Sequence, residues 1–305
     1  MVVIGLMGNG FITIAGGLEW SRNKTLSSSD MILLVLSVSR LFFLGLTLSI
    51  HYSAFADISN PKYIPNSVIF LWAFFNAVTL WTATWLAAFY CMKILTFAQP
   101  LLVKIKMGIS RMVPYLLLGS VLASLLLSLP FNWFENCYQC CNGTNVPLGN
   151  STGRCDVWTT GMLFSALLYI AGTFPSFLIC LASSVFLLHS LLHHVKRMQQ
   201  NREGFRDQRM DVQLRAVKMV TSFLLLYTVA FAAEISLMLF TSPLTMVLSI
   251  VMVAGYHSGH AISLIITNSK LRQMFLMTLY DPLCQRLWTT TSPSYPKTPK
   301  EMGQS

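Results

Sequence analysis

Long runs of apolar residues, separated by short polar segments, recur along most of this chain. An α-helix needs about 20 such residues to cross the roughly 30 Å hydrocarbon layer of a bilayer. Within lipid, each backbone N–H and C=O group must find its partner inside its own segment, so a spanning run forms a helix. With 54% hydrophobic and 10% charged residues, the chain is also too apolar for a soluble domain. The sequence therefore predicts an all-α, polytopic membrane protein.

The apolar runs predict a bundle of seven transmembrane helices. We place the spans at Met1–Leu18, Met31–Tyr52, Ser67–Cys91, Met112–Phe131, Trp158–Leu192, Leu214–Phe240 and Leu244–Thr267. No internal repeat is visible, which disfavours transporters built from repeated halves. Residues 1–280 are expected to form one seven-helix domain and residues 281–305 a cytoplasmic tail. Because the first span is short, we also expect the natural start of the chain to lie upstream of Met1.

The net charge of +10 is distributed unevenly across the predicted membrane. Only Lys62 and Arg154 lie on one side. The cations of the other side are Arg22, Lys24, Lys93, Lys104, Lys106, Arg111, Lys196, Arg197, Arg202, Arg206, Arg209, Arg215, Lys218, Lys270, Arg272, Arg286, Lys297 and Lys300. Because cytoplasmic loops carry the excess of Lys and Arg, this side is the cytoplasm and the N-terminus is outside. Topology accounts for the basic charge, so nothing indicates nucleic acid as a partner.

The loop between the fourth and fifth spans is predicted to be extracellular, and its residues agree with that side. Asn142 and Asn150 each begin a glycosylation sequon. Disulfides are plausible in this oxidising setting, and three complete pairings remain open. The cysteines of the loop are Cys137, Cys140, Cys141 and Cys155. A zinc site is the alternative, but no spacing matches a zinc knuckle, and we expect neither a metal nor a cofactor.

Six of the seven spans carry motifs that keep a consistent order. The usual signposts of rhodopsin-like receptors are missing, since there is no Asp-Arg-Tyr after the third span and no Asn-Pro-x-x-Tyr in the seventh. The motifs present are Gly8-Asn9-Gly10-Phe11-Ile12, Leu33-x-x-Leu36-Ser37-x-Ser39-Arg40, Trp81-x-x-Thr84-x-Leu86-x-x-Phe89-Tyr90-x-x-Lys93-Ile94, Leu187-x-x-Ser190-Leu191-x-x-His194-x-x-x-Met198, Arg215-Ala216-Val217 and His260-x-x-x-Leu264-Ile265-x-x-Asn268-Ser269-Lys270-Leu271-Arg272.

These motifs resemble those of the bitter taste receptors, the type 2 taste receptor family of G-protein-coupled receptors. The chain also departs from the family pattern. His257 stands in place of a proline, Ala261 in place of a serine and Gln213 in place of a histidine. We therefore expect the helix geometry of the seventh span to differ from that of the family.

The resemblance implies a plasma-membrane receptor that binds bitter small molecules from outside and activates a heterotrimeric G protein of the gustducin type. Phospholipase C and calcium release would follow. A mostly apolar pocket with one or two polar anchors would give broad recognition. Membrane lipid is the other expected partner, and pairing with itself or with another receptor is left open. The alternatives are a vomeronasal-type pheromone receptor, or a transporter or channel, which would need polar residues along several spans.

Three residues are candidates for contact with the ligand. Trp72 and Asn76 are four residues apart and so share one face of the third span, where the resemblance places pocket residues. An indole supplies a flat apolar wall and a cation–π face, whereas an amide supplies an orienting hydrogen bond. Glu234 lies inside the sixth span, where an acid either pairs with a cationic ligand or bonds a neighbouring helix while protonated.

Arg40 is the second functional candidate, because a charge inside an apolar run is expensive unless it faces a polar interior. It lies roughly 13 Å from the cytoplasmic start of its span at 1.5 Å per residue, which is deep for snorkelling to the surface. We therefore expect a packing and switching node in which Arg40 bonds Asn9 and Ser258, with His260 nearby in the seventh span.

The basic cytoplasmic ends of the third, fifth and sixth spans are the expected G-protein surface. Its candidate residues are Lys93, Lys104, His194, Met198, Arg215 and Lys218. An enzyme is not expected. A seven-helix zinc hydrolase would need several histidines and acids to converge, and the histidines outside the seventh span fall on opposite sides of the membrane.

Overall fold

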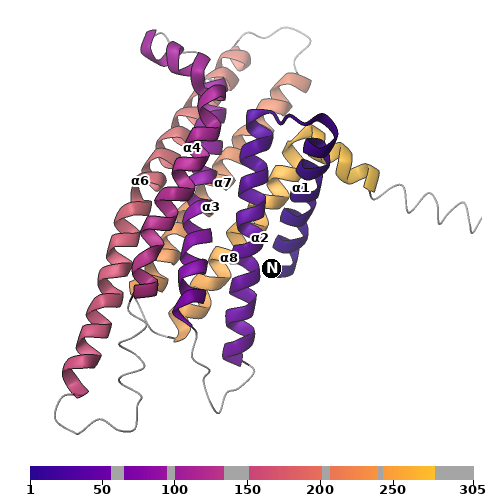
Figure 1. The fold of residues 1–305 in the computed structure, drawn as a ribbon. Coiled ribbons are helices and arrows are strands. Elements are labelled where there is room, and N and C mark those ends of the chain that lie inside the picture. The colour runs from indigo at the N-terminus through magenta and orange to yellow at the C-terminus, as the bar shows by residue number, and fades with distance from the viewer. Residues whose placement is uncertain (56–64, 95–99, 134–150, 201–206, 240–242, 279–305) are drawn as a thin grey trace, which may run out of the picture. The chain divides into compact units, whose positions relative to one another are not determined.

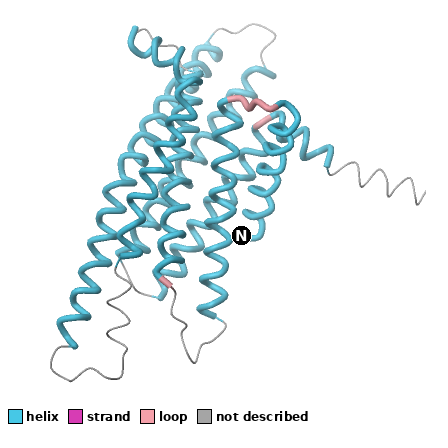
Figure 2. Tube along the Cα trace, viewed as in Figure 1, coloured by secondary structure: helices cyan, strands magenta, loops and turns pink. Residues whose placement is uncertain are grey.

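The computed structural model describes residues 1–55, 65–94, 100–133, 151–200, 207–239 and 243–278, and nearly all of these are helical (Figure 2). The long helices in Figure 1 are α1 (Val2–Asn23), α2 (Ser28–Phe55), α3 (Asn66–Ile94), α4 (Pro100–Trp133), α6 (Ser151–Gln200), α7 (Asp207–Leu239) and α8 (Pro243–Thr267). In this described part, seven helices are long and apolar enough to cross a membrane. The predicted all-α fold with seven spans is confirmed.

Several helices extend beyond the spans expected from hydropathy. Helix α6 covers Ser151–Gln200, whereas the apolar run predicted Trp158–Leu192. Helix α1 continues to Asn23 and has 22 residues, so it is about 33 Å long at 1.5 Å per residue, enough to cross the hydrocarbon layer. Hydropathy marks only the part of a helix that suits lipid, and polar turns at either end escape it.

The chain divides into two compact units, Met1–Ser263 and Leu264–Ser305. In the second unit, residues 269–278 form a short helix. The Asn268 side chain begins this helix, because its Oδ1 accepts hydrogen bonds from the backbone N–H groups of Lys270 at 3.1 Å and Leu271 at 3.3 Å. The expected domain boundary at residue 280 lies outside the described residues and stays a prediction.

Within the first unit, α3 is the central helix. It packs against α2, α4 and α6, while α1 packs on α2 and α7 packs on α6. In its most hydrophobic window, 56% of the residues of α3 are buried, compared with 22% for α1. Side chains that project from α3 therefore meet several other helices at once, which makes it the natural support for an interior site.

Helix α4 shows which residues face its neighbours. Ser120, Ser124 and Ser128 are buried, whereas Leu122 and Leu126 are exposed. A spacing of four residues places the serines on one helix face. Small residues let helices approach closely in a membrane, and lipid accepts the leucines on the outside. This pattern, with hydroxyls inside and leucines outside, is what a bundle in hydrocarbon requires.

Two of the three buried hydroxyl groups of α4 named above have partners, whereas Ser124 Oγ has none among the described residues. Ser128 Oγ donates to the carbonyl of Ser124 at 2.8 Å. Ser120 Oγ accepts a hydrogen bond from Trp85 Nε1 at 2.7 Å, which joins α3 to α4. Such bonds allow polar side chains to lie in an interior where water is scarce.

Two glycines permit close approach between helices. A Cβ atom at Gly5 would lie 2.6 Å from Ser258 Oγ and 2.9 Å from Leu44 Cδ1. A Cβ at Gly172 of α6 would overlap the side chain of Leu127 on α4. Glycine at these positions therefore sets how near α1 comes to α2 and α8, and how near α4 comes to α6.

The connection from α1 to α2 is short and specified by local bonds. Lys24 adopts the left-handed conformation, with φ 55°, and its N–H bonds the carbonyl of Trp20 to end α1. Ser27 then begins α2, because its Oγ accepts from the Asp30 N–H at 3.2 Å and donates to Asp30 Oδ2 at 2.8 Å. These reciprocal bonds resemble a capping box and fix the angle at which the chain re-enters the bundle.

Candidate functional site

The Arg40 side chain lies inside the bundle and is fully buried. Its Nη2 donates to the hydroxyl of Tyr256 at 3.1 Å and to Nδ1 of His260 at 2.8 Å, which joins α2 to α8. The guanidinium carbon also lies 5.1 Å from the centre of the Tyr256 ring. Snorkelling to the membrane surface does not occur, and the expectation of an interior position holds.

The bond between Arg40 and His260 defines the form of the imidazole. Arginine is a donor only, so Nδ1 of His260 must accept, and the ring proton of a neutral imidazole is then on Nε2. The ring packs against Phe223 of α7, with ring centres 4.6 Å apart. His260 therefore contacts α2 through a polar edge and α7 through its face.

The predicted partners of Arg40 were partly wrong. Asn9 is buried, but its Nδ2 donates to the carbonyl of Gly5 at 2.8 Å. Ser258 Oγ donates instead to the carbonyls of Ala254 at 2.8 Å and Met1 at 2.9 Å. The rotation of α8 presents Tyr256 and His260 to Arg40, and Ser258 faces the glycine side of α1.

Tyr256 is the contact that the sequence reasoning missed. It lies four residues before His260, so the two side chains share one face of α8. The sequence contained a usable signal, because a tyrosine and a histidine at this spacing can both face a buried arginine. The prediction omitted Tyr256 because the family motif starts at His260.

From Tyr256 a chain of aromatic and hydroxyl contacts reaches three further helices. The Tyr256 and Tyr227 rings lie 5.7 Å apart, and Tyr227 stacks on Phe177 at 6.0 Å. The hydroxyl groups of Tyr227 and Thr84 are 3.4 Å apart, and Thr84 Oγ1 also donates to the carbonyl of Ser176 at 3.0 Å. The Arg40 cluster is therefore continuous with α3, α6 and α7.

The predicted ligand residues lie around α3. Asn76 Nδ2 donates to the hydroxyl of Tyr169 on α6 at 3.1 Å, and the Glu234 carboxyl of α7 lies beside the Asn76 amide. Both Asn76 and Glu234 are buried, and Asn76 Oδ1 and Glu234 Oε1 have no hydrogen-bond partner. The structure brings these two residues together, and their use by a ligand stays a prediction.

Trp72 is turned toward α2. Its Nε1 donates to Thr47 Oγ1 at 3.0 Å, and its ring lies 5.2 Å from that of Phe43. Only 9% of the side chain is exposed. Trp72 therefore forms an aromatic wall one helical turn from Asn76.

The other predicted residues are placed only in part. Lys93 is exposed, with Nζ 5.3 Å from the centre of the Phe89 ring, and Lys218 is exposed as well. Lys104, His194, Met198, Arg215 and Cys155 are in helices, but their side chains lie outside the described residues. Asn142, Asn150, Cys137, Cys140 and Cys141 also lie outside them. Within the described ranges, no group of three His, Cys, Asp or Glu side chains could hold a metal ion.

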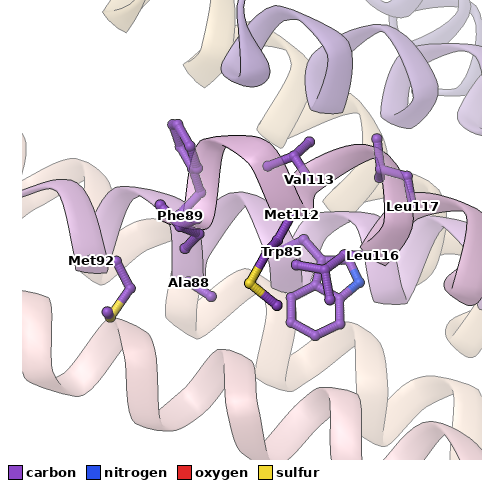
Figure 3. A pocket seen from close by; sticks show the side chains of 9 residues that line it. Trp85, Ala88, Phe89, Met92, Met112, Val113, Leu116 and Leu117 are labelled. Atoms are coloured by element: carbon purple, nitrogen blue, oxygen red, sulfur yellow. The ribbon is translucent and has the colours of Figure 1, made fainter. Parts of the chain in front are cut away.

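An apolar cavity of about 250 Å³ lies between α3 and α4 (Figure 3). It is lined by Trp85, Ala88, Phe89, Met92, Ile109, Met112, Val113, Leu116 and Leu117. None of the predicted ligand residues contributes to it. The polar side-chain group in its lining, the indole N–H of Trp85, already bonds Ser120, and the cavity shares no residue with the Asn76–Glu234 site.

Comparison with known proteins gives consistent results. A model of the family described as "Taste receptor protein (TAS2R)" matches residues 1–282. The chain is 34% identical to taste receptor type 2 member 40 of Gallus gallus over 287 residues, which cover 91% of both chains. It is 31% identical to taste receptor type 2 member 9 of Homo sapiens, covering 91% of this chain and 90% of the relative.

The fold itself is similar to a solved structure. The crystal structure of squid rhodopsin aligns with a TM-score of 0.55 and 15% sequence identity, covering 95% of this chain and 84% of that one. At this identity the likeness concerns the seven-helix fold alone.

Replacing Tyr256 by phenylalanine should destabilise the bundle. Tyr256→Phe removes an acceptor from a buried guanidinium, which should lower the free energy of unfolding by about 1–3 kcal/mol. The midpoint of thermal unfolding of the purified receptor measures the effect. Tyr115→Phe is the matched control, because Tyr115 is 74% exposed. Equal midpoints for the two variants would contradict a stabilising role for this bond.

Proposed function

The chain belongs to the type 2 taste receptor family of G-protein-coupled bitter taste receptors, which are not enzymes, and we propose that it binds bitter small molecules between α3, α6 and α7. The observation that carries this proposal is the pair Asn76 and Glu234. Both are buried, and each has an oxygen atom without a partner. Buried unpaired acceptors are costly, so a ligand that supplies donors would gain affinity there.

The surroundings of this pair suit a broad range of ligands. Trp72, Phe43 and Tyr169 provide large aromatic surfaces nearby. Aromatic walls bind many apolar shapes, while a few fixed polar atoms select orientation. A ligand that bonds the Asn76 amide must break or share the hydrogen bond between Asn76 and Tyr169. This cost reduces the favourable free energy of ligand binding. Weak and broad recognition is the expected result.

The receptor is proposed to lie in the plasma membrane with its N-terminus outside. The excess of lysine and arginine in the first, third and fifth loops supports this orientation. The Asn142 and Asn150 sequons then face the exterior. Agonist binding would favour one of two helix arrangements and expose the inner ends of α3, α6 and α7 to a gustducin-type G protein. Phospholipase C and calcium release would follow.

The first test is calcium imaging of cells that express the chain with a gustducin-chimeric G protein. A panel of bitter compounds should give concentration-dependent calcium signals that vanish when the chimeric G protein is omitted. Surface labelling of the glycosylated loop establishes that the receptor is present. A receptor at the surface that answers no compound of the panel would contradict the proposal, as would ion flux without a G protein.

Glu234→Gln separates charge recognition from packing. The substitution keeps the size of the side chain and removes the carboxyl group that ionises beside a cationic ligand, so the half-maximal concentration of cationic agonists should rise about tenfold, equivalent to 1.4 kcal/mol. Neutral agonists should be unaffected. Glu19→Gln in α1 is the matched control. Equal shifts for cationic and neutral agonists would show that Glu234 serves packing rather than ligand charge.

Lys93 and Lys218 test the cytoplasmic surface. Both are exposed, and charges at the rim of an interface set the rate of association more than the affinity of a distant ligand. Lys93→Gln combined with Lys218→Gln should slow G-protein activation several-fold while agonist affinity is kept. Arg22→Gln, also at an exposed cation of the predicted cytoplasmic side, is the control. Unchanged activation rates would place the G protein elsewhere.

A further inference from the structure

We propose that the Arg40 cluster is a binding site for a small monovalent anion, for which chloride is the fitting species. The site lies between α2 and α8, is formed by the guanidinium of Arg40 and the imidazole of His257, and is separate from the Asn76–Glu234 pair. It goes beyond the recognition of bitter compounds, because it concerns an ion held in the interior of the bundle.

The buried charge of Arg40 has no counter-charge among the described groups around it. Arg40 is fully buried, and an arginine side chain stays protonated in proteins. In the described part of the chain, the acidic side chains that influence the ionisation of Arg40 are the phenols of Tyr256 and Tyr227, and no carboxylate is among them. Its hydrogen-bond partner His260 accepts through Nδ1 and supplies no negative charge. A buried charge without a counter-charge is unfavourable, and a bound anion removes that cost.

Arg40 and His257 carry N–H donors that no described group of the protein accepts. The N–H groups on Arg40 Nη2 are used, whereas Nε and Nη1 are buried and have no partner. His257 is also fully buried, and neither of its ring nitrogens has a partner. One of these nitrogens carries a proton in either tautomer. The His257 and Tyr256 rings lie 5.0 Å apart, and the Arg40 guanidinium carbon lies 5.1 Å from the same Tyr256 ring, so donors from two helices serve one region.

Aromatic rings surround the His257 side chain. The His257 ring packs against Phe43 at 4.7 Å and against Tyr256 at 5.0 Å. Aromatic edges carry partial positive charge, which suits an anion. A halide accepts several N–H donors from different directions and has no proton of its own to place. Asn9 Oδ1, an unpaired buried acceptor on α1, suits water instead, so a site filled by water alone is the competing outcome.

Such an anion would stabilise the arrangement described here. It binds where α2 and α8 present Arg40 and His257 together, and a ligand that prefers one arrangement shifts the population toward it. Chloride should therefore raise the stability of the ligand-free receptor by mass action.

The test uses the purified full chain in lipid nanodiscs, prepared in sodium gluconate and titrated with sodium chloride at constant ionic strength. The midpoint of thermal unfolding should rise by a few degrees and saturate, and bromide should act in the same way. Chlorine-35 NMR line broadening, which bromide should reverse, gives a readout independent of stability and of bitter agonists. Equal midpoints in chloride and gluconate, with no line broadening, would mean that water fills the site and would overturn the proposal.

Variants locate the effect. His257→Phe removes the donor but keeps a ring, so the half-saturating chloride concentration should rise about tenfold, the equivalent of one strong contact. His189→Phe is the matched control, because His189 is exposed on α6. Arg40→Lys, which keeps the charge and removes the Nε and Nη1 donors, should also weaken the response. Chloride stabilisation with the same half-saturation in His257→Phe and Arg40→Lys would assign the ion to another place and contradict the proposal.

Discussion

The buried guanidinium of Arg40 is the constraint on which the arrangement of this bundle depends. Hydrocarbon cannot solvate it, so the helices must bring polar groups to it. Tyr256 and His260 do so from one face of α8. Tyr256 then contacts Tyr227, and Tyr227 meets Thr84, so the requirement of a single side chain on α2 extends to α7 and α3. Rotation of α8 would break these contacts together.

Tyr256 also connects the two polar clusters of the interior. Its hydroxyl accepts from Arg40, and an ionised Glu234 would interact with the Tyr256 phenol. A ligand that altered the charge of Glu234 at the proposed site would therefore change the field at the group that bonds Arg40. This gives a physical route from the proposed ligand site to the contact between α2 and α8, carried by one residue rather than by a long series of packing changes.

Sequence reasoning was reliable where one property decides the structure. Apolar runs of spanning length predicted the seven long helices of the described residues but not the short helix at 269–278, and the depth of Arg40 predicted its interior position. The partners of Arg40 depend on how α8 is rotated about its own axis, to within a fraction of a turn. Because α8 is almost uniformly apolar, the periodicity of its sequence does not reveal this rotation. Ser258 was therefore predicted as the partner of Arg40, whereas the structure has Tyr256 in that role. Asn76 was proposed as a ligand residue from the family resemblance and Glu234 because it is an acid inside a span. Tyr169, which bonds Asn76 from α6, had no signal in the sequence because pairing across helices leaves no local pattern.

The close approach at Gly172 has a genetic consequence. Every other amino acid carries a Cβ, and that atom would overlap Leu127 on α4. Any missense change in this one codon therefore forces the Leu127 side chain to shift or α4 and α6 to move apart, although neither residue belongs to the Arg40 cluster or the Asn76–Glu234 pair. Individuals that inherit such an allele would differ in how much receptor folds and not in which compounds it detects, so their loss of sensitivity would extend equally to all agonists.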